Sequence, residues 1–203
     1  LILAGSVFFG SLLGFILARA KIAGQKISRL LADTYIAVMR CTPPIVLLFI
    51  VYYGLPELLL TTIRLDINSI EKAIFVLVTY TLLCGATMSE IMRSSYESID
   101  KGQWEASKSL GLSRSQTMRY IILPQAIKNI LPALANEFVT LIKETAVAST
   151  IGVLDLMHAS KIVQSNSYKA FEPLIIVAAI YFMMTFTISK LVGILERRLS
   201  YHD

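Results

Sequence analysis

The residues best suited to chemistry gather in one apolar segment, residues 127–150. Its central part carries the polar side chains of Asn136, Glu137, Thr140, Lys143, Glu144 and Thr145. At helical spacing, most of these residues lie on or near one face, with Glu137 beside it. A charged side chain costs about 2.5–3.5 kcal/mol at the centre of a bilayer, so such a row should face a cavity or a protein partner rather than lipid.

These residue types suit a zwitterionic amino acid. Its ammonium group needs an acid, and its carboxylate needs hydrogen-bond donors. Glu144 and Lys143 supply the two charges, and Thr145 and Thr42 add hydroxyl groups. In the alternative interpretation, Lys143 and Glu144 pair with neighbouring groups and only hold helices together. The expected substrate path is lined by Thr42, Pro43, Asn136, Thr140, Lys143, Glu144 and Thr145.

Two further features have structural interpretations. Pro43 and Pro44 remove two helical hydrogen bonds, which frees carbonyl groups to line a cavity or lets the chain bend. A simple loop between an interfacial helix and a membrane span explains this pair slightly better. Glu137 and Glu90 are interpreted as structural, and Glu90 is expected to pair with Arg93 near the cytoplasmic side.

The sequence contains no catalytic or metal-binding signature. A Walker P-loop, G-x-x-x-x-G-K-[ST], is absent, so the chain is not expected to bind ATP. His158 and His202 are the only histidines and are too far apart for a metal or nucleophilic site. Cys41 and Cys84 lie in apolar segments and are interpreted as small core residues rather than a disulfide. We expect no enzyme activity, no metal and no cofactor in this chain.

The composition is that of a membrane protein. Hydrophobic residues make up 55% of the 203 residues, charged residues make up 16%, and mean hydropathy is +0.65. Soluble domains contain about 45–50% apolar and about 25% charged residues. The net charge of +5 comes from basic residues that flank apolar runs and lack interleaved aromatic residues, which argues against nucleic-acid binding.

Five apolar segments approach the roughly 20 residues that a helix needs to cross about 30 Å of hydrocarbon. They cover residues 1–20, 30–53, 71–93, 127–150 and 173–195. The first ends in basic residues without a small-residue cleavage site, so it is interpreted as a span rather than a signal peptide. We expect further residues to precede Leu1, and residues 1–203 are predicted to form a single domain.

The distribution of basic residues predicts the orientation. They concentrate in the connections after the first and third segments, and again after the fifth segment at Arg197 and Arg198. The positive-inside rule places these regions in the cytoplasm. Five spans then put the N-terminal end outside and the C-terminus inside the cell, with outer loops at residues 54–70 and 151–172.

A polar stretch from residue 94 to residue 124 lies between the third and fourth spans. Residues 100–103 are predicted to form a turn, and residues 104–110 a short helix. Gly111 is placed to end this helix in a left-handed cap.

A second short helix is predicted to follow this glycine. Ser113 can cap it at its start, and it is expected to run from residue 114 to about residue 121, before Pro124 ends it. Two short helices joined at a glycine predict a compact knob beneath the membrane.

This knob resembles the EAA motif of the permease subunits of ABC importers. The motif reads E-A-A, three residues, G, nine residues, I-x-L-P, and it matches Glu105-Ala106-Ser107, Gly111 and Ile121-x-Leu123-Pro124. Ser107 departs from it, as a small residue in place of the second alanine. In that family the loop forms coupling helices that dock into a groove of the cytoplasmic ATPase. The resemblance implies this role for Glu105, Ala106, Gly111, Leu112, Ser113 and Pro124.

Essentially the whole chain resembles polar amino acid permeases of the histidine, arginine and glutamine importer type. Residues 40–44, 89–93 and 123–138 carry this likeness. Cys41 and Pro44 replace the glycine and the usual leucine of the family's R-G-T-P-L step. Thr87 stands where the family usually has tyrosine, a change that would alter the pocket.

The resemblance implies an all-α integral membrane protein with five transmembrane helices and cytoplasmic coupling helices, of the type I importer (MetI-like) fold. Such permeases lie in the bacterial inner membrane and pair as homo- or heterodimers. They work with two ATPase subunits, which bind ATP and magnesium, and with an extracytoplasmic substrate-binding protein. The expected function is translocation of a polar amino acid by alternating access, driven by ATP hydrolysis in the partner subunits.

Two other function classes are alternatives. A passive channel or scaffold subunit leaves the EAA spacing unexplained. An intramembrane enzyme would need a Ser-His pair, paired aspartates or H-E-x-x-H, and the sequence has none of these. The residues leave open whether the amino acid is cationic, neutral and polar, or cystine, and whether the partner permease is a copy or a paralogue.

Overall fold

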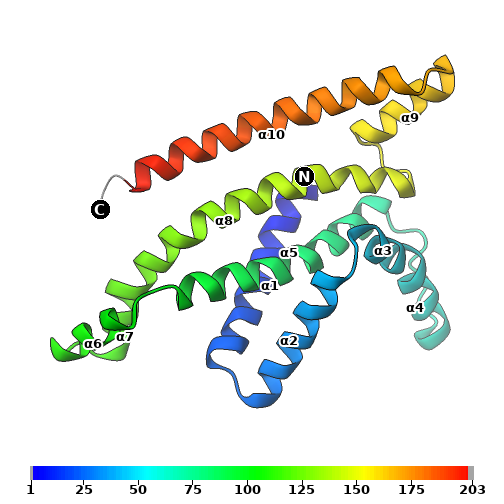
Figure 1. Ribbon diagram of the computed structural model, residues 1–203. Coiled ribbons are helices and arrows are strands. Elements are labelled where there is room, and N and C mark those ends of the chain that lie inside the picture. The colour runs from blue at the N-terminus through cyan, green and yellow to red at the C-terminus, as the bar shows by residue number, and fades with distance from the viewer. Residues whose placement is uncertain (1, 201–203) are drawn as a thin grey trace.

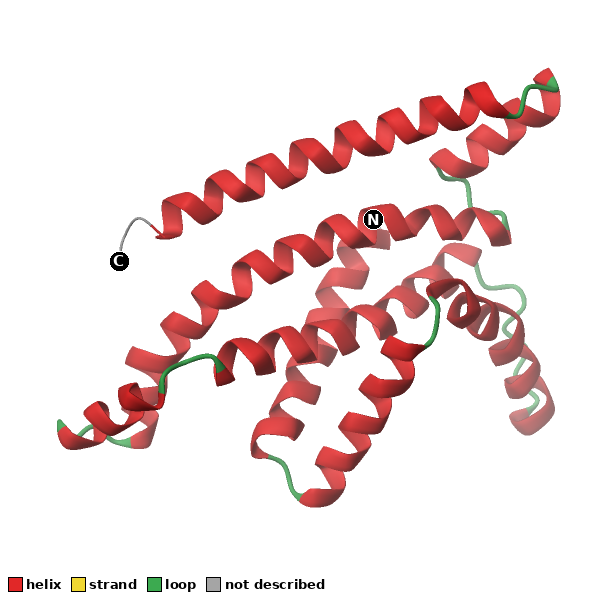
Figure 2. Cartoon of the chain, in the orientation of Figure 1, coloured by secondary structure: helices red, strands yellow, loops and turns green. Residues whose placement is uncertain are grey.

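The structure is a computed structural model that describes residues 2–200 (Figure 1). Leu1 and His202 lie outside the described residues, as do the side chains of Arg197 and Arg198. Helices joined by short connections make up the described part of the chain (Figure 2). They are α1 (Ile2–Ala23), α2 (Lys26–Cys41), α3 (Pro44–Phe49), η1 (Ile50–Gly54), α4 (Leu55–Ile63), α5 (Lys72–Glu97), α6 (Lys101–Ser109), α7 (Arg114–Thr117), η2 (Met118–Ile122), α8 (Leu123–Glu144), η3 (Thr145–Ile151), α9 (Leu156–Ser167) and α10 (Phe171–Ser200).

The described residues contain four helical stretches that are long and apolar enough to cross a membrane. They are Ile2–Ala23, Pro44–Ile63, Lys72–Glu97 and Phe171–Ile194. A bent pair of helical stretches, Arg114–Ile151 and Leu156–Ser167, gives a fifth span if the two count as one. They meet at a short break with an angle of 48°. The predicted all-α membrane fold is therefore confirmed, with four candidate spans, or five if the bent pair counts as one.

Close packing of α1 against α5 forms the centre of the bundle. The two helices run parallel, with Gly10 against Cys84 and Gly14 against Met88. A Cβ atom added at Gly14 would lie only 2.5 Å from the Cβ of Met88, and one at Gly10 only 2.7 Å from the Cβ of Cys84. Small residues allow such an approach, and in lipid this close contact supplies the attraction between helices.

The core continues from α5 to α3, α8 and η3. Its buried side chains are Leu48, Val76, Tyr80, Cys84, Met88, Leu141, Ala148 and Ile151. The hydroxyl of Tyr80 donates a hydrogen bond to the backbone carbonyl of Glu144, which fixes the end of α8 against α5.

The position predicted for the second span is wrong. Residues 26–41 form the separate helix α2, and the membrane-length stretch of this region is Pro44–Ile63. Thr42 and Pro43 have extended backbones, because a residue that precedes a proline is pushed out of the helical region. The proline pair therefore separates α2 from the span, as the simpler of its two interpretations predicts. The following loop is also shorter than expected and covers residues 64–71.

The fourth predicted span is α8, and the way α8 begins corrects the role of Pro124. α7, η2 and α8 form one helical run from Arg114 to Glu144, so Pro124 ends no helix and stands in the first turn of α8. The preceding turn η2 is π-helical, and the backbone N–H of Leu123 bonds to the carbonyl of Met118, five residues back. A proline, which has no N–H, is tolerated where the bonding pattern changes in this way.

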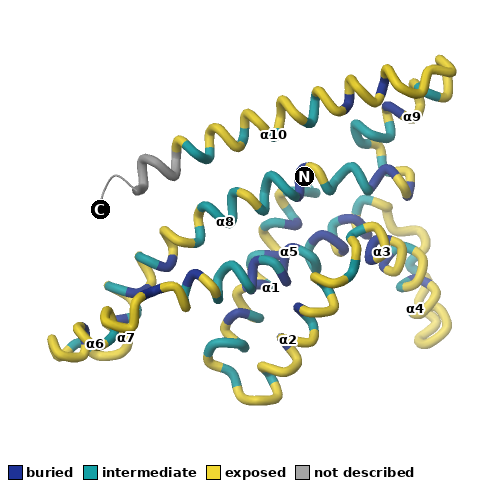
Figure 3. Tube along the Cα trace, viewed as in Figure 1, coloured by how far each residue is buried: buried dark blue, intermediate teal, exposed yellow. Residues whose placement is uncertain are grey.

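Helix α10 lies along α8 at the edge of the molecule (Figure 1). Most of its described residues are exposed (Figure 3), including the stacked rings of Phe182 and Phe186. An apolar exterior of this kind is compatible with lipid, because hydrocarbon solvates it and all backbone hydrogen bonds stay within the helix.

We predict that Gly14→Ala destabilises the fold, because its new methyl group must displace the backbone of α5. Overpacking of this kind costs about 1–3 kcal/mol. Gly193→Ala is the matched control, because a Cβ atom there meets nothing within 4 Å. Thermal unfolding of the purified protein in detergent measures both variants. An equal unfolding temperature for the two would contradict the packing of α1 on α5.

Candidate functional site

A polar cavity of about 290 Å³ lies among the end of α2, the start of α3, α5 and α8. Its lining residues are Met39, Arg40, Thr42, Pro44, Leu83, Thr87, Glu137, Thr140 and Glu144. The lining thus combines apolar walls with one guanidinium group, two carboxyl groups and three hydroxyl groups. Concave sites of this composition are typical of small-molecule binding. We refer to it as the central cavity.

The face of α8 that lines this cavity differs from the predicted one. Glu137, Thr140 and Glu144 follow each other at intervals of three and four residues and therefore share one helical face. Asn136 and Lys143 are exposed and do not line the central cavity. The register of α8 is set by burial of its apolar side chains against α5 and α1, which turns the acids inward.

The two predicted hydroxyl partners lie in different places. Thr42 lines the central cavity, and its hydroxyl donates a hydrogen bond to the carbonyl of Val38 at 2.7 Å. Thr145 instead donates to the carbonyl of Ile142 at 2.6 Å and lies beside Tyr80, on the side of α8 that faces α1. Thr140 lines the cavity as predicted, and its hydroxyl also bonds back to its own helix.

Pro43 is exposed and is not part of the cavity lining, whereas the neighbouring Pro44 is. The break that these prolines make still matters for the site. It turns the chain between α2 and α3, so that residues from both helices reach the same cavity.

Sequence reasoning missed Arg40 and underrated Glu137 as cavity residues. The spacing of Glu137, Thr140 and Glu144 is a signal for a shared face, but Asn136 and Lys143 gave an equally regular alternative. Arg40 stands two residues before Thr42 in an otherwise apolar stretch, and an ionisable residue in such a place is itself a sign of a functional site.

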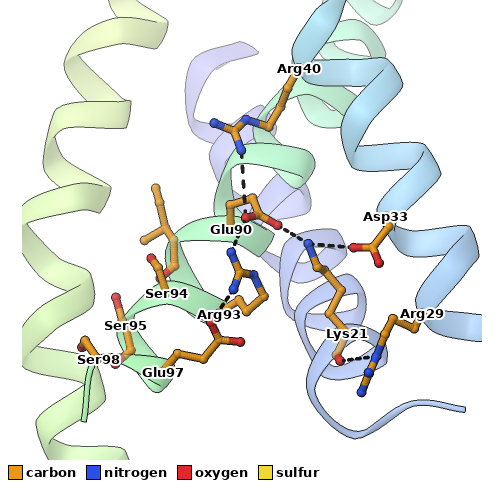
Figure 4. A network of polar contacts seen from close by, with 11 residues as sticks. Lys21, Arg29, Asp33, Arg40, Glu90, Arg93, Ser94, Ser95, Glu97 and Ser98 are labelled. Atoms are coloured by element: carbon orange, nitrogen blue, oxygen red, sulfur yellow. Dashed lines mark hydrogen bonds and ion pairs between the residues drawn. The ribbon is translucent and has the colours of Figure 1, made fainter. Parts of the chain in front are cut away.

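A charge cluster joins α1, α2 and α5 beside the central cavity (Figure 4). Glu90 on α5 is its centre and accepts hydrogen bonds from Lys21 on α1 and, at 2.8 Å, from Arg93 on α5. Lys21 also pairs with Asp33 on α2 at 2.9 Å. The predicted pair of Glu90 and Arg93 is therefore present, within a larger network that also reaches Arg40.

The predicted knob is built from α6, α7 and η2. Gly111 has a φ of 76° and ends α6, because the left-handed region suits glycine. The N–H of Leu112 bonds to the carbonyl of Ser107 and the N–H of Gly111 bonds to that of Lys108, which is a Schellman cap. Ser113 caps α7 through a reciprocal capping box with Gln116.

The start of α6 differs from the predicted turn at residues 100–103. The helix begins at Lys101, because the carboxylate of Asp100 accepts a hydrogen bond from the N–H of Gly102 and caps it.

A small core fixes the knob to the bundle. Ile99, Ile122 and Ala126 are buried, and Trp104 packs against them with its ring 6.4 Å from that of Tyr96. The opposite side of α6 is exposed, including Glu105, Ala106 and Leu110, whose side chain is 79% exposed. Pro124 is exposed on the first turn of α8. The knob is thus held on one side and free on the other.

Comparison with known proteins agrees with this architecture. Residues 10–201 match the family of binding-protein-dependent transport system inner membrane components. The chain is 37% identical to the arginine transport system permease protein ArtQ of Bacillus subtilis, over 98% of this chain and 87% of that protein. It is also 37% identical to a Rickettsia bellii protein that is named for a glutamine transport system permease, over 96% of this chain and 86% of that protein.

Solved structures show the same fold. An amino acid ABC transporter crystallised with histidines is 42% identical, with a TM-score of 0.87 over 97% of this chain and 88% of that chain. The MetNI methionine ABC transporter in an inward-facing conformation is 19% identical, with a TM-score of 0.73 over 97% of this chain and 90% of that chain, and it supports the fold alone.

The bundle, the polar cavity and the exposed knob define a transmembrane permease subunit of the ABC importer class. The chain belongs to the family of binding-protein-dependent transport system inner membrane components. The family match supports the permease interpretation and not the alternative of a passive channel or scaffold.

We predict that Trp104→Ala loosens α6 from the bundle, because it removes the ring that packs on the small core. Hydrogen–deuterium exchange of residues 101–109 should become faster, while exchange in α5 stays slow. Leu110→Ala is the matched control, since this side chain is exposed and supports no packing. Equal exchange in the two variants would show that Trp104 does not anchor the knob.

Proposed function

We propose that this chain is the permease subunit of an ATP-driven importer that carries a polar amino acid into a bacterial cell. One observation carries the proposal: a single helical run, Arg114 to Glu144, connects the exposed knob with the wall of the central cavity. A displacement of the knob is therefore transmitted directly to Glu137, Thr140 and Glu144.

The chemistry of the central cavity supports an amino acid as the cargo. Glu144 and Glu137 supply acids for an ammonium group, and the Arg40 guanidinium supplies a bidentate hydrogen-bond donor for a carboxylate. Arg40 takes the role that the sequence suggested for Lys143. Thr87, which is smaller than the tyrosine usual in the family, leaves room in the wall of the cavity. The relatives named for arginine and glutamine transport agree with a polar amino acid.

The proposed mechanism is alternating access in a dimer of permease subunits. Two partner ATPase subunits bind ATP with magnesium and dock on the knobs through Glu105, Ala106 and Gly111, with Leu112, Ser113 and Pro124 shaping the docking site. An extracytoplasmic binding protein delivers the amino acid. Closure of the ATPases opens the bundles outward, and hydrolysis returns them to the inward-open state.

We propose the orientation from the distribution of charge. The knob holds Lys101, Lys108, Arg114 and Arg119, and the turn between α1 and α2 is flanked by Lys21 and Lys26. The positive-inside rule places both in the cytoplasm. Because α1 and α5 run parallel toward that side, the N-terminal end of α1 lies outside and the end of α10 inside.

Glu105→Lys is expected to abolish transport-coupled ATPase activity in the reconstituted complex while the chain still inserts. The substitution reverses the charge on the exposed side of α6, where the ATPase is proposed to dock. Glu172→Lys is the matched control, because Glu172 is also exposed but lies in the first turn of α10, outside the knob. Unchanged coupling in Glu105→Lys would remove the docking role of α6.

Glu144→Gln is expected to weaken amino acid binding to the reconstituted complex by about 10- to 100-fold, because a hydrogen bond to a charged group contributes about 1.5–3 kcal/mol and each 1.4 kcal/mol is tenfold. Lys143→Gln, at the adjacent exposed position, should change affinity by no more than about twofold, the usual limit for surface substitutions. Equilibrium binding of radiolabelled arginine, glutamine and histidine measures both. A larger loss in Lys143→Gln than in Glu144→Gln would reject the central cavity as the binding site.

A further inference from the structure

A second cavity, of about 430 Å³, lies next to the central cavity on the side of the α1–α2 turn. Its lining residues are Lys21, Asp33, Ile36, Ala37, Arg40, Cys41 and Glu90. We refer to it as the inner cavity. Arg40 lines both cavities, so its side chain stands at the boundary between them.

Arg40 is held more loosely than its charged neighbours. Its Nη1 atom lies 4.0 Å from Oε2 of Glu90, whereas Arg93 reaches the same oxygen at 2.8 Å. The side chain of Arg40 is 56% exposed, against 19% for Glu90. Glu90 is already bound by Lys21 and Arg93, so it is a fixed anchor and Arg40 is the member of the cluster that is free to move.

The backbone position of Arg40 also favours movement. It lies in the last turn of α2, two residues before Thr42, where the extended backbone of Thr42 and Pro43 begins. Nearer its start, α2 is tied to the bundle by the ion pair of Asp33 with Lys21. It is also tied by a 2.9 Å hydrogen bond from the Tyr35 hydroxyl to the carbonyl of Leu82. α2 is thus tethered at its middle, and its end beside Arg40 is followed by the non-helical residues Thr42 and Pro43.

We propose that Arg40 is the gate between the central and inner cavities, and that the inner cavity is the route by which the amino acid leaves for the cytoplasm. The guanidinium group binds the carboxylate of the amino acid in the central cavity and moves with it toward the inner cavity. There Glu90 competes for the guanidinium and repels the carboxylate, which releases the cargo. This gate rests on the proposed function and adds its exit route and the residue that controls it.

A purely structural role for Arg40 leads to a different expectation. A basic residue in the last turn of a helix is stabilised by the helix dipole, and such a role needs no route through the inner cavity. The two roles differ in what happens when the inner cavity is blocked.

Cys41 provides the means of blocking it. Contrary to the expectation of a core residue, Cys41 is exposed and lines the inner cavity, whereas Cys84 is fully buried. The complete complex is labelled with a bulky maleimide, checked by mass for a single addition to this chain, and then reconstituted in vesicles with the knobs facing the lumen. The lumen holds ATP, and uptake is measured for radiolabelled amino acid supplied outside together with the binding protein.

Modification of Cys41 is expected to remove most of the uptake while binding of the radiolabelled amino acid persists. Uptake by the Cys41→Ser variant should be the same with and without the reagent. Leu31→Cys in the Cys41→Ser background is the matched control, because Leu31 is exposed on the same helix and lines neither cavity. Labelling there should leave uptake unaffected.

The outcomes separate the two proposals. Uptake that survives full modification of Cys41 would overturn the exit route and leave the proposed function standing. No uptake in the untreated complex would overturn the proposed function and the gate with it. As a second readout, Arg40→Gln should raise ATP-independent leakage of amino acid across the vesicles, and Arg40→Lys should leak less than Arg40→Gln. Equal leakage in these two variants would contradict a charged gate.

Discussion

The cost of placing a polar group in hydrocarbon is the constraint on which the rest of this structure depends. A carboxylate on a membrane helix must be paired with a cation or must face water, and this structure has neighbouring examples of both arrangements. Glu90 is paired by a lysine and an arginine from two helices, whereas Glu137 and Glu144 face the central cavity. The first solution holds α1 and α5 in register, and the second creates a place for a charged cargo.

The same constraint explains why the bundle has a tight half and a loose half. α1 and α5 meet through glycines, with buried side chains on either side, and this contact leaves no space for a passage. α2 and α10 are more exposed (Figure 3). Both cavities lie along α2. In the proposed mechanism, the closely packed pair of α1 and α5 is the frame against which α2 and α8 would move.

The sequence predicted the fold and the knob well because both rest on local signals. Apolar length identified the spans, Gly111 required a positive φ, and Ser113 required a cap. Prolines were harder to interpret, since Pro43 and Pro44 ended a helix whereas Pro124 did not. The difference depends on backbone bonding: a π-helical turn before Pro124 removes the need for its N–H, and no propensity scale contains that information. The cavity face of α8 was predicted wrongly in part for a similar reason, because Asn136 and Lys143 also fit a regular helical face and only packing shows that Glu137 lines the cavity instead.

The π-helical turn η2 has one more consequence. Such a turn contains one residue more than the equivalent α-helical turn, and one residue corresponds to about 100° of rotation about the axis. The direction in which Glu137 and Glu144 point from α8, relative to the knob, therefore depends on this single inserted residue. Deleting one residue within Met118–Ile122 would therefore rotate the cavity-facing acids by about 100° relative to the knob.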